Sequence, residues 1–230
     1  MRIDFKNIFF QYMNTDMYIL KGITGQISEP GFHGLFGPSG VGKTTLAKII
    51  AGRITNFSGK ITLQRINKIF YSYNMERVPG WSCIADHLEK ITEDCRKSLL
   101  NDLIKSFGLE KCLKSRFAML SLGQQNRVNL TRYLLQDFDI LIMDESLANV
   151  DEITRKKIIL KIKDLFPGKC FLYISHNLTE VARFCKQITV LRASHKNPQA
   201  VCVNGQNDTR EQTSRNQELE NTIMEVVHAS

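Results

Sequence analysis

The feature that most constrains the fold is a glycine-rich segment at residues 37–44, which reads Gly-Pro-Ser-Gly-Val-Gly-Lys-Thr. It follows an apolar run at 32–36 and leads into Lys43–Ala51, whose composition is helical. A strand, a loop of the pattern GxxxxGK[ST] and a helix together make a phosphate-binding loop. Every position of the pattern is matched in this context, which makes a chance glycine-rich turn a remote explanation. The segment therefore indicates an α/β fold that binds the phosphates of a nucleotide.

Each part of this loop has an expected task. Its glycines allow successive backbone N–H groups to turn toward phosphate oxygens, and the start of the helix adds its positive end. Lys43 is expected to reach the β- and γ-phosphates of ATP, and the hydroxyl of Thr44 is expected to bind Mg²⁺. The residues expected to hold ATP in this segment are Gly37, Pro38, Ser39, Gly40, Val41, Gly42, Lys43, Thr44 and Thr45.

A pair of acids after an apolar strand supports this interpretation. The run at 140–143 ends in Asp144 and Glu145. Carboxylates at the carboxyl edge of a parallel sheet stand where α/β proteins bind their ligands. Asp144 is expected to hold Mg²⁺ through water, and Glu145 is expected to polarise the water that attacks a phosphate. Acids often begin loops, so the weight of this pair comes from its combination with the phosphate loop.

The remaining chain alternates strand and helix signals. Strands are predicted at 3–12, 18–28, 32–36, 60–64, 68–73, 139–143, 170–174 and 187–191, and helices at 122–136, 152–165 and 178–185. This alternation predicts a layered α/β core with a parallel sheet. Between 83 and 115, Leu99, Leu103 and Phe107 recur four residues apart, which predicts an inserted helical lobe.

Residues 120–127, shortly before the acidic strand, read Leu-Ser-Leu-Gly-Gln-Gln-Asn-Arg. Ser121 followed by Gln124 is a capping box that begins a helix. Behind a full phosphate loop, the segment also resembles the LSGGQ signature of the ATP-binding cassette (ABC) ATPases. In that family two subunits pair head to tail, and each signature helix closes on the ATP held by the other subunit. The resemblance therefore implies that Ser121, Gly123 and Gln124 contact ATP.

Further positions match the family in order and spacing, so the resemblance covers roughly residues 3–192. It implies that Tyr12 stacks on adenine and that His176 contacts the γ-phosphate. It also implies that Asp151 crosses the interface between two subunits. Taken alone, Tyr12 would be an ordinary aromatic at the end of a strand, and His176 would be an ordinary loop histidine. Because both follow the family's order of motifs around a full phosphate loop, the functional interpretation is favoured. The residues expected to act in catalysis are Lys43, Glu145 and His176.

Two positions depart from the family pattern. The glutamine that contacts Mg²⁺ in the family falls on Asn74, which carries the same amide on a shorter side chain. The first glycine of the signature is replaced by Leu122, whereas Gly123 is retained. These changes bear on the turnover rate more than on ATP binding. The residues expected to contact the metal are Thr44, Asn74 and Asp144.

The resemblance implies a P-loop NTPase core of the ABC ATPase type, with an antiparallel β region and an inserted helical subdomain. The ATPase domain is expected at 1–203, and its helical subdomain at about 75–135. After residue 204 the chain is rich in Asn, Gln, Thr and Glu. That composition predicts a polar, mobile tail at 204–230, with at most a short helix near Glu218–Val227.

Composition narrows the setting in which the chain works. No run approaches the ~20 apolar residues of a membrane-spanning helix, and the start of the chain lacks the apolar core of a secretory signal. Six scattered cysteines without a CxxC pair predict buried thiols that do not bind a metal. The net charge of +8 is compatible with binding to nucleic acid or to an anionic lipid surface. It is equally compatible with charges that only face solvent on the helices. These features predict a cytoplasmic chain, and the resemblance to the ABC ATPases implies a peripheral location at the cytoplasmic face of a membrane.

Three functions are compatible with these residues. The favoured one is the ATP-hydrolysing subunit of an ABC transporter, an importer that drives solute through a separate membrane-spanning permease subunit. It would work with a second ABC ATPase subunit, the same or a related chain, and with a solute-binding protein. The loop start and the segment around Trp81 resemble importers of the nitrate, sulfonate and taurine type.

The first alternative is a soluble ABC ATPase that acts on nucleic acid or ribosomes. Such proteins usually carry two cassettes or a long coiled coil, and neither is seen here, so no nucleic acid is expected. The second alternative is a weakly hydrolysing regulatory subunit, which Asn74 and Leu122 favour. The joint retention of four residues argues against it: Lys43, Asp144, Glu145 and His176.

The segment Met75–Trp81 directly follows Asn74 and contains Val78 and Pro79. It is expected at the surface, as one wall of a groove that anchors a short helix of the permease. In the competing interpretation Trp81 packs inside the helical lobe, because tryptophans are usually highly buried.

Overall fold

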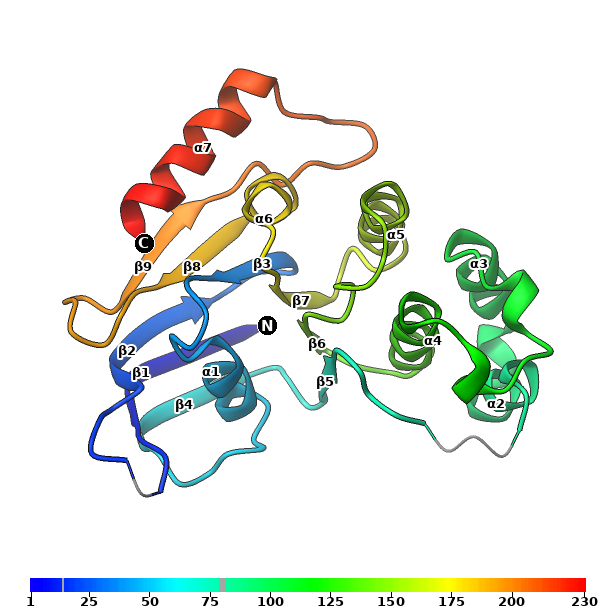
Figure 1. Cartoon of the computed structure of the whole chain (residues 1–230), viewed down its shortest axis with the longest axis horizontal. Helices are drawn as coiled ribbons and strands as arrows, with labels where there is room; N and C mark the ends of the chain where they lie inside the picture. Colours follow the sequence, from blue (N-terminus) through cyan, green and yellow to red (C-terminus); the bar gives the residue numbers. More distant parts are fainter. Residues whose placement is uncertain (14, 79–81) are drawn as a thin grey trace.

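The computed structural model of the chain describes residues 1–13, 15–78 and 82–230 (Figure 1). Its strands form two sheets. A three-stranded antiparallel sheet has the strand order β2–β1–β4, and a six-stranded sheet has the order β5–β6–β7–β3–β8–β9. Within the described ranges, no helix is both long enough and apolar enough to cross a bilayer.

The elements follow the predicted order along the chain. The strands are β1 (Arg2–Phe10), β2 (Leu20–Ile27), β3 (Gly31–Phe36), β4 (Ser58–Gln64), β5 (Ile69–Tyr73), β6 (Ile140–Asp144), β7 (Cys170–Ile174), β8 (Gln187–Leu191) and β9 (Ala200–Asn204). The helices are α1 (Lys43–Ile50), α2 (Ile84–Ile91), α3 (Lys97–Ser106), α4 (Leu122–Leu134), α5 (Glu152–Leu165), α6 (Leu178–Phe184) and α7 (Asn216–Ala229). Short 3-10 turns lie at Asp94–Arg96, Glu110–Cys112 and Phe117–Met119. Each predicted strand corresponds to one of β1–β8, whereas β9 was not predicted.

The larger sheet has the predicted parallel core. β5, β6, β7, β3 and β8 run parallel to their neighbours, and only β9 pairs antiparallel, with β8. Helices cover both faces of this sheet (Figure 1). Because helices bury both faces of this sheet, its central strands can be apolar at every position.

Helix α1 is packed between the two sheets. One hydrophobic cluster joins Leu46 and Ile49 of α1 to Ile8 of β1, and to Ile140 and Ile142 of β6. The intervening residues of β6 are also buried but face the opposite cluster, because successive side chains of a strand point to opposite faces. The burial of α1 from both sides fixes the helix that follows the glycine-rich loop.

The second cluster lies under α4, α5 and α6 and extends into a helical lobe built from α2 and α3. Leu88 of α2, Leu103 of α3 and Phe107 are completely buried there. Leu99, the first residue of the predicted helical repeat, packs at the margin of the same cluster. The inserted helical subdomain of the predicted fold class is therefore present between β5 and β6.

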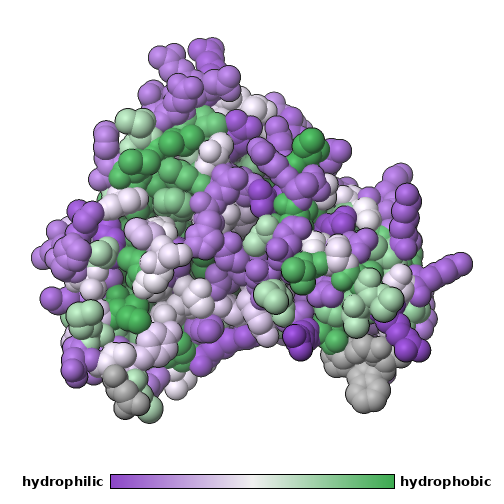
Figure 2. Space-filling view, viewed as in Figure 1, coloured by the Kyte–Doolittle hydropathy of each residue, from purple (hydrophilic) through white to green (hydrophobic). Residues whose placement is uncertain are grey.

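The tail differs from expectation. In place of at most a short helix near Glu218–Val227, α7 spans Asn216–Ala229, and it buries Leu219, Thr222 and Val226. In Figure 1 it lies against β9 and α6, and its Val226 belongs to the same cluster as Phe184 of α6. The physical reason is a spacing of three to four residues between the buried positions, which forms one helix face within an otherwise polar segment. Figure 2 shows apolar surface over the C-terminal half of α7, where Met224 and Val227 are exposed.

The cysteine prediction is partly wrong. Cys112, Cys170 and Cys185 are buried, but Cys95 and Cys202 are exposed. Cys202 lies on the antiparallel edge strand β9, which has one face open to solvent, and that strand was not foreseen.

The packing of α7 predicts a contrast between two adjacent valines. Val226→Ala removes a completely buried side chain and should destabilise the fold by about 2 kcal/mol. Val227→Ala makes the same chemical change at a side chain that is 51% exposed, and should change stability by less than ~0.5 kcal/mol. Urea unfolding measures both. Equal effects of the two variants would contradict the packing described for α7.

Candidate nucleotide site

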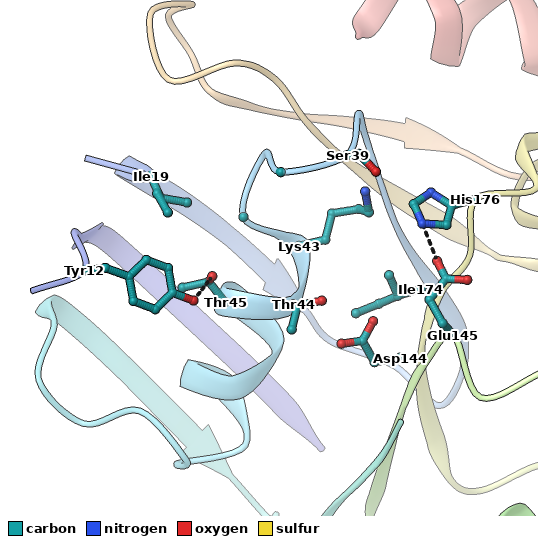
Figure 3. Close-up of a pocket in the computed structure, with 12 residues that line it drawn as sticks. Tyr12, Ile19, Ser39, Lys43, Thr44, Thr45, Asp144, Glu145, Ile174 and His176 are labelled. Atoms are coloured by element: carbon teal, nitrogen blue, oxygen red, sulfur yellow. Dashed lines mark hydrogen bonds and ion pairs between the residues drawn. The ribbon is translucent and has the colours of Figure 1, made fainter. Parts of the chain in front are cut away.

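The predicted functional residues meet at one edge of the six-stranded sheet. β6, β7 and β3 are neighbours, and their register aligns Asp144 with Ile174 and Ile174 with Leu35. Because parallel neighbours end at the same edge, the segments that follow these strands emerge side by side. A cavity of about 330 Å³ lies there. It is lined by Tyr12, Ile19, Ser39, Gly40, Gly42, Lys43, Thr44, Thr45, Asp144, Glu145, Ile174 and His176 (Figure 3).

The glycine-rich loop delivers an open helix start to this cavity. Gly42 caps α1 with a left-handed backbone (φ 104°), and no side chain caps the helix. A Cβ at Gly42 would lie 2.7 Å from Leu20 Cδ2 and 2.8 Å from Ile19 Cγ2, so only glycine fits. The first turn of α1 contains no acid. Its backbone N–H groups are therefore available to an anion at the positive end of the helix.

Lys43 is a buried cation held by the loop itself. Its Nζ donates hydrogen bonds to the carbonyl oxygens of Gly37, at 2.7 Å, and Pro38, at 2.8 Å. Burial lowers the pKa of the Lys43 ammonium, and the negative charges of Glu145 and Asp144 oppose that shift. The lysine therefore stands between the loop and two carboxylates, where a phosphate would meet its charge.

Asp144 is held by a contact that sequence reasoning missed. The hydroxyl of Tyr71, on β5, donates a 2.6 Å hydrogen bond to Asp144 Oδ2. Burial, followed by this bond to Asp144, raises the pKa of the Tyr71 hydroxyl, so the phenol stays protonated and acts as the donor. One carboxylate oxygen is thereby fixed, which orients the other. The sequence placed Tyr71 on a predicted strand at 68–73, but it carried no signal that this strand lies beside β6.

Glu145 occupies a strained backbone position beside His176. Its φ is 55°, in the left-handed region, which costs a residue other than glycine about 1–3 kcal/mol. The Glu145 N–H is held by the carbonyl of Ile174 at 3.1 Å. His176 Nε2 lies 3.2 Å from Glu145 Oε1, at ion-pair distance (Figure 3). Among the described residues, Oε1 has no hydrogen-bond partner of good geometry. This conformation directs the carboxylate into the cavity.

The pKa of Glu145 is raised, above all by burial and further by the charge of Asp144. His176, Lys43 and Arg155 oppose the shift. A carboxylate with a raised pKa accepts a proton more readily near neutral pH, which is the property of a general base.

The residues present fit Mg²⁺ in part. Among the described residues, no three His, Cys, Asp or Glu side chains gather into a metal site. Mg²⁺ normally needs only one or two protein oxygens beside substrate phosphates. Thr44 and Asp144 offer such oxygens and line a shared wall of the cavity. Asn74 differs, because its Oδ1 already accepts hydrogen bonds from Asn126 and Asn149.

Tyr12 lies at the end of the cavity away from His176 (Figure 3). Its hydroxyl shares a 2.9 Å hydrogen bond with Thr45 Oγ1, and its ring packs edge-on against Phe10 at 4.9 Å. Tyr12 as a whole residue is 43% exposed. A half-open aromatic face beside the loop is compatible with stacking on a base, and the adenine contact stays a prediction.

The signature segment begins α4 as predicted. Ser121 Oγ accepts a hydrogen bond from the Gln124 N–H, and Gln124 Oε1 accepts one from the Ser121 N–H, which completes the capping box. None of Ser121, Gly123 and Gln124 is among the described residues that line the cavity. Leu122 is 47% exposed at the helix start. The predicted ATP contact of this segment therefore needs a second subunit.

The structure describes only part of the segment that was predicted to form a groove for the permease. Met75–Val78 are described, and Tyr133 on α4 donates a 2.8 Å hydrogen bond to the Glu76 carboxylate. Pro79, Gly80 and Trp81 lie outside the described residues, so the interpretation of Trp81 stays a prediction.

The comparisons identify the family. The model of the ABC transporter family matches residues 20–148, more than half of the chain. The chain therefore belongs to the ABC transporter family.

Two relatives illustrate the range of matches. The chain is 31% identical to a probable metal transport system ATP-binding protein of Thermotoga maritima, over 82% of this chain and 80% of that protein. It is 30% identical to a spermidine/putrescine import ATP-binding protein of Fusobacterium nucleatum, over 76% of this chain. The match covers 51% of that relative, so the chain spans about half the length of the polyamine protein.

Solved structures support the fold. A dimeric ATP-binding cassette in a post-hydrolysis state, bound to ADP and Pi, aligns with a TM-score of 0.70 and 24% identity. That alignment covers 82% of this chain and 94% of the cassette. A bacterial Atm1-family exporter with ATP bound aligns with a TM-score of 0.74 and 18% identity, over 99% of this chain and 42% of the exporter. The predicted fold class is confirmed, whereas the nitrate, sulfonate and taurine type is not.

The contacts of Lys43 predict its role in nucleotide affinity. Lys43→Ala removes a charge-assisted partner of the phosphates and should weaken binding of fluorescent ATP by about 10- to 100-fold. Lys60→Ala, at an exposed position on β4, serves as the control and should leave affinity unchanged. Unchanged affinity in a folded Lys43→Ala variant would refute the assignment.

Proposed function

We propose that the chain is an ATP-hydrolysing subunit of an ABC transporter. The observation that carries the proposal is the convergence of the phosphate loop, Asp144, Glu145 and His176 on one cavity. Membership of the ABC transporter family adds independent support. ATP and water are the proposed substrates, and ADP and phosphate are the proposed products.

The bound triphosphate would lie across the start of α1. Backbone N–H groups of the loop and the Lys43 ammonium would hold the phosphate oxygens. The Thr44 hydroxyl and the Asp144 oxygen that does not accept from Tyr71 would hold Mg²⁺, which neutralises phosphate charge when it is bound. Tyr71 contributes by keeping the Asp144 carboxylate in one orientation. Tyr12 would close the adenine end.

Glu145 is the proposed general base. Its carboxylate would accept a proton from the attacking water, and its pKa, raised by burial, suits that task. His176 lies within reach of the same carboxylate and would contact the γ-phosphate. The left-handed backbone at Glu145 keeps the carboxylate in place during the reaction, so less reorganisation is required.

A second ABC subunit, the same or a related chain, is the proposed dimer partner. Its Ser121, Gly123 and Gln124 would complete the site from the open side of the cavity. In this chain Leu122 and Met119 are exposed beside that helix start, at 47% and 79%. Apolar side chains at such positions favour contact with another surface.

We further propose an importer that works through a separate permease, with the chain peripheral at the cytoplasmic face of the membrane. The name of the spermidine/putrescine relative supports import, as does that of a nickel import ATP-binding protein of Pseudomonas putida, which is 29% identical to the chain. A solute-binding protein would belong to the same system. The domain division at 1–203, with a helical subdomain at about 75–135, is retained as part of this proposal.

The regulatory alternative keeps one supporting observation, because Asn74 and Leu122 depart from the family pattern. Phosphate release by the purified chain separates the two functions. Steady turnover of ATP supports the enzyme, whereas tight binding without release supports the regulatory subunit.

The proposed base predicts the effect of an isosteric change. Glu145→Gln should lower turnover at least about 100-fold, because an amide cannot accept the proton of the attacking water. ATP affinity should be retained. Trapped ATP should also stabilise a dimer, visible in size-exclusion chromatography with ATP and Mg²⁺. The control is Glu152→Gln, which changes an exposed acid in the first turn of α5. This variant should hydrolyse ATP at the rate of the unmodified chain. A Glu145→Gln variant that hydrolyses ATP at the unmodified rate would exclude Glu145 as the base.

The proposed partner predicts what the chain binds in its own cells. Affinity purification of the tagged chain should recover a membrane-spanning protein and no RNA. Recovery of ribosomes or RNA, with no membrane protein, would favour the nucleic-acid alternative that the charge of +8 keeps open.

A further inference from the structure

Three asparagines meet beside the nucleotide site, where Asn74 lines a second cavity together with Thr44, Asp144 and Glu145. The Oδ1 of Asn74, in the turn after β5, accepts a hydrogen bond from Asn126 Nδ2 at 3.0 Å. The same oxygen accepts a second hydrogen bond from Asn149 Nδ2 at 2.8 Å. Asn126 belongs to α4, and Asn149 lies in the loop between β6 and α5. One carbonyl oxygen therefore ties together three segments that carry predicted site residues.

The acceptor capacity of Asn74 is fully used by these two bonds. An amide oxygen has two lone pairs, and both face N–H donors here. A cation at the same oxygen would have to displace at least one donor. Asn126 is only 2% exposed, so its displaced amide would remain buried without a partner, which is costly. The short side chain of Asn74 thus serves contacts within the chain and competes poorly for a metal.

The position of Asn74 is fixed from the sheet side as well. Its backbone N–H donates to the carbonyl of Asp144 at 3.1 Å, which continues the β5–β6 ladder past the ends of the strands. The asparagine is therefore anchored to the residue predicted to hold Mg²⁺, while its side chain reaches the signature helix.

A second contact joins the same helix and the same loop. A Cβ at Gly123 would lie 2.3 Å from the carbonyl oxygen of Asn149, so the start of α4 sits directly on that backbone. This close approach gives Gly123 a role within its own chain, besides the ATP contact expected in a partner subunit. Asn74, Asn126, Asn149 and Gly123 together form what we call the asparagine junction.

We propose that Asn74 is a positioning residue, and that through the asparagine junction it holds the signature helix and the loop 145–151 in register with the nucleotide site. This inference rests on the proposed function for its consequence in turnover. Its structural part concerns the free chain and can be tested without nucleotide. It replaces the earlier expectation that Asn74 binds the metal.

The decisive variant is Asn74→Leu, which keeps the approximate size of the side chain and removes the acceptor. It should lower the melting temperature of the nucleotide-free chain by about 3–10 °C, because the buried donor of Asn126 loses its partner. Amide hydrogen exchange at residues 120–126 and 145–151 should become at least about fivefold faster. Asn74→Asp keeps an oxygen with the same two acceptor directions and should restore both measurements. Asn101→Leu, on the exposed face of α3, is the matched control.

Metal dependence distinguishes positioning from ligation. The Mg²⁺ concentration for half-maximal binding of a fluorescent ATP analogue should stay within about twofold in Asn74→Leu, and should rise about tenfold or more in Asp144→Asn. The turnover number of Asn74→Leu should fall while its KM for ATP is retained. A tenfold rise in the Mg²⁺ requirement of Asn74→Leu, with unchanged melting and exchange, would overturn the proposal in favour of a metal ligand.

Two further variants keep the test decisive if Asn74→Leu does not fold. Asn149→Ala removes only the exposed donor, and Gly123→Ala forces the helix start away from the Asn149 carbonyl. Both should accelerate exchange at 120–126 in the nucleotide-free chain, and Asn149→Ala should leave the Mg²⁺ requirement unchanged. Unaltered amide hydrogen exchange in both variants would overturn the proposed role of the asparagine junction. If the unmodified chain bound no ATP at all, the proposed function would be rejected. The exchange measurements would still show whether the asparagine junction positions the signature helix.

Discussion

The structure depends on the backbone ladder that joins β6, β7 and β3 in parallel. Because these strands are hydrogen-bonded neighbours in register, the phosphate loop, the acid pair and His176 leave the sheet at one edge. The ladder continues beyond the strand ends through the N–H groups of Asn74 and Glu145. Nearby, the buried hydroxyl of Ser146 donates to Ser72 on β5. Main-chain bonding between the strands therefore sets where these segments leave the sheet.

Packing on both faces of the sheet makes this edge rigid. α1 is enclosed between the antiparallel and the parallel sheet, and α4 and α5 cover the other face. Such enclosure supports two costly features, the left-handed backbone of Glu145 and the buried ammonium of Lys43. Strained or charged groups persist only where the surroundings over-determine them. The packing energy of the scaffold thus offsets the cost of the strained backbone at Glu145 and of the buried charge of Lys43.

Much of the fold could be predicted from sequence, because its main signals are local. The loop pattern, the Ser121–Gln124 capping box and the apolar central strands are each readable within a few residues. The contacts of Tyr71 with Asp144 and of Asn149 with Asn74 join residues 73 and 75 positions apart, and no local pattern encodes them. α7 was underestimated because its three buried positions are spread through a polar segment. The expectation that Asn74 contacts the metal came from a family position, and the two donors that its oxygen meets are visible only in the structure.

The two carbonyl partners of Lys43 have a consequence for the departure of a nucleotide. A buried ammonium that lost its only partner would face a large desolvation penalty, and that penalty would oppose release of the bound anion. Here the carbonyls of Gly37 and Pro38 can take over the ammonium as a phosphate leaves. The loop thereby exchanges one set of acceptors for another, which lowers the barrier to dissociation. Such a loop favours repeated cycles of loading and emptying over permanent retention of a tightly held ligand.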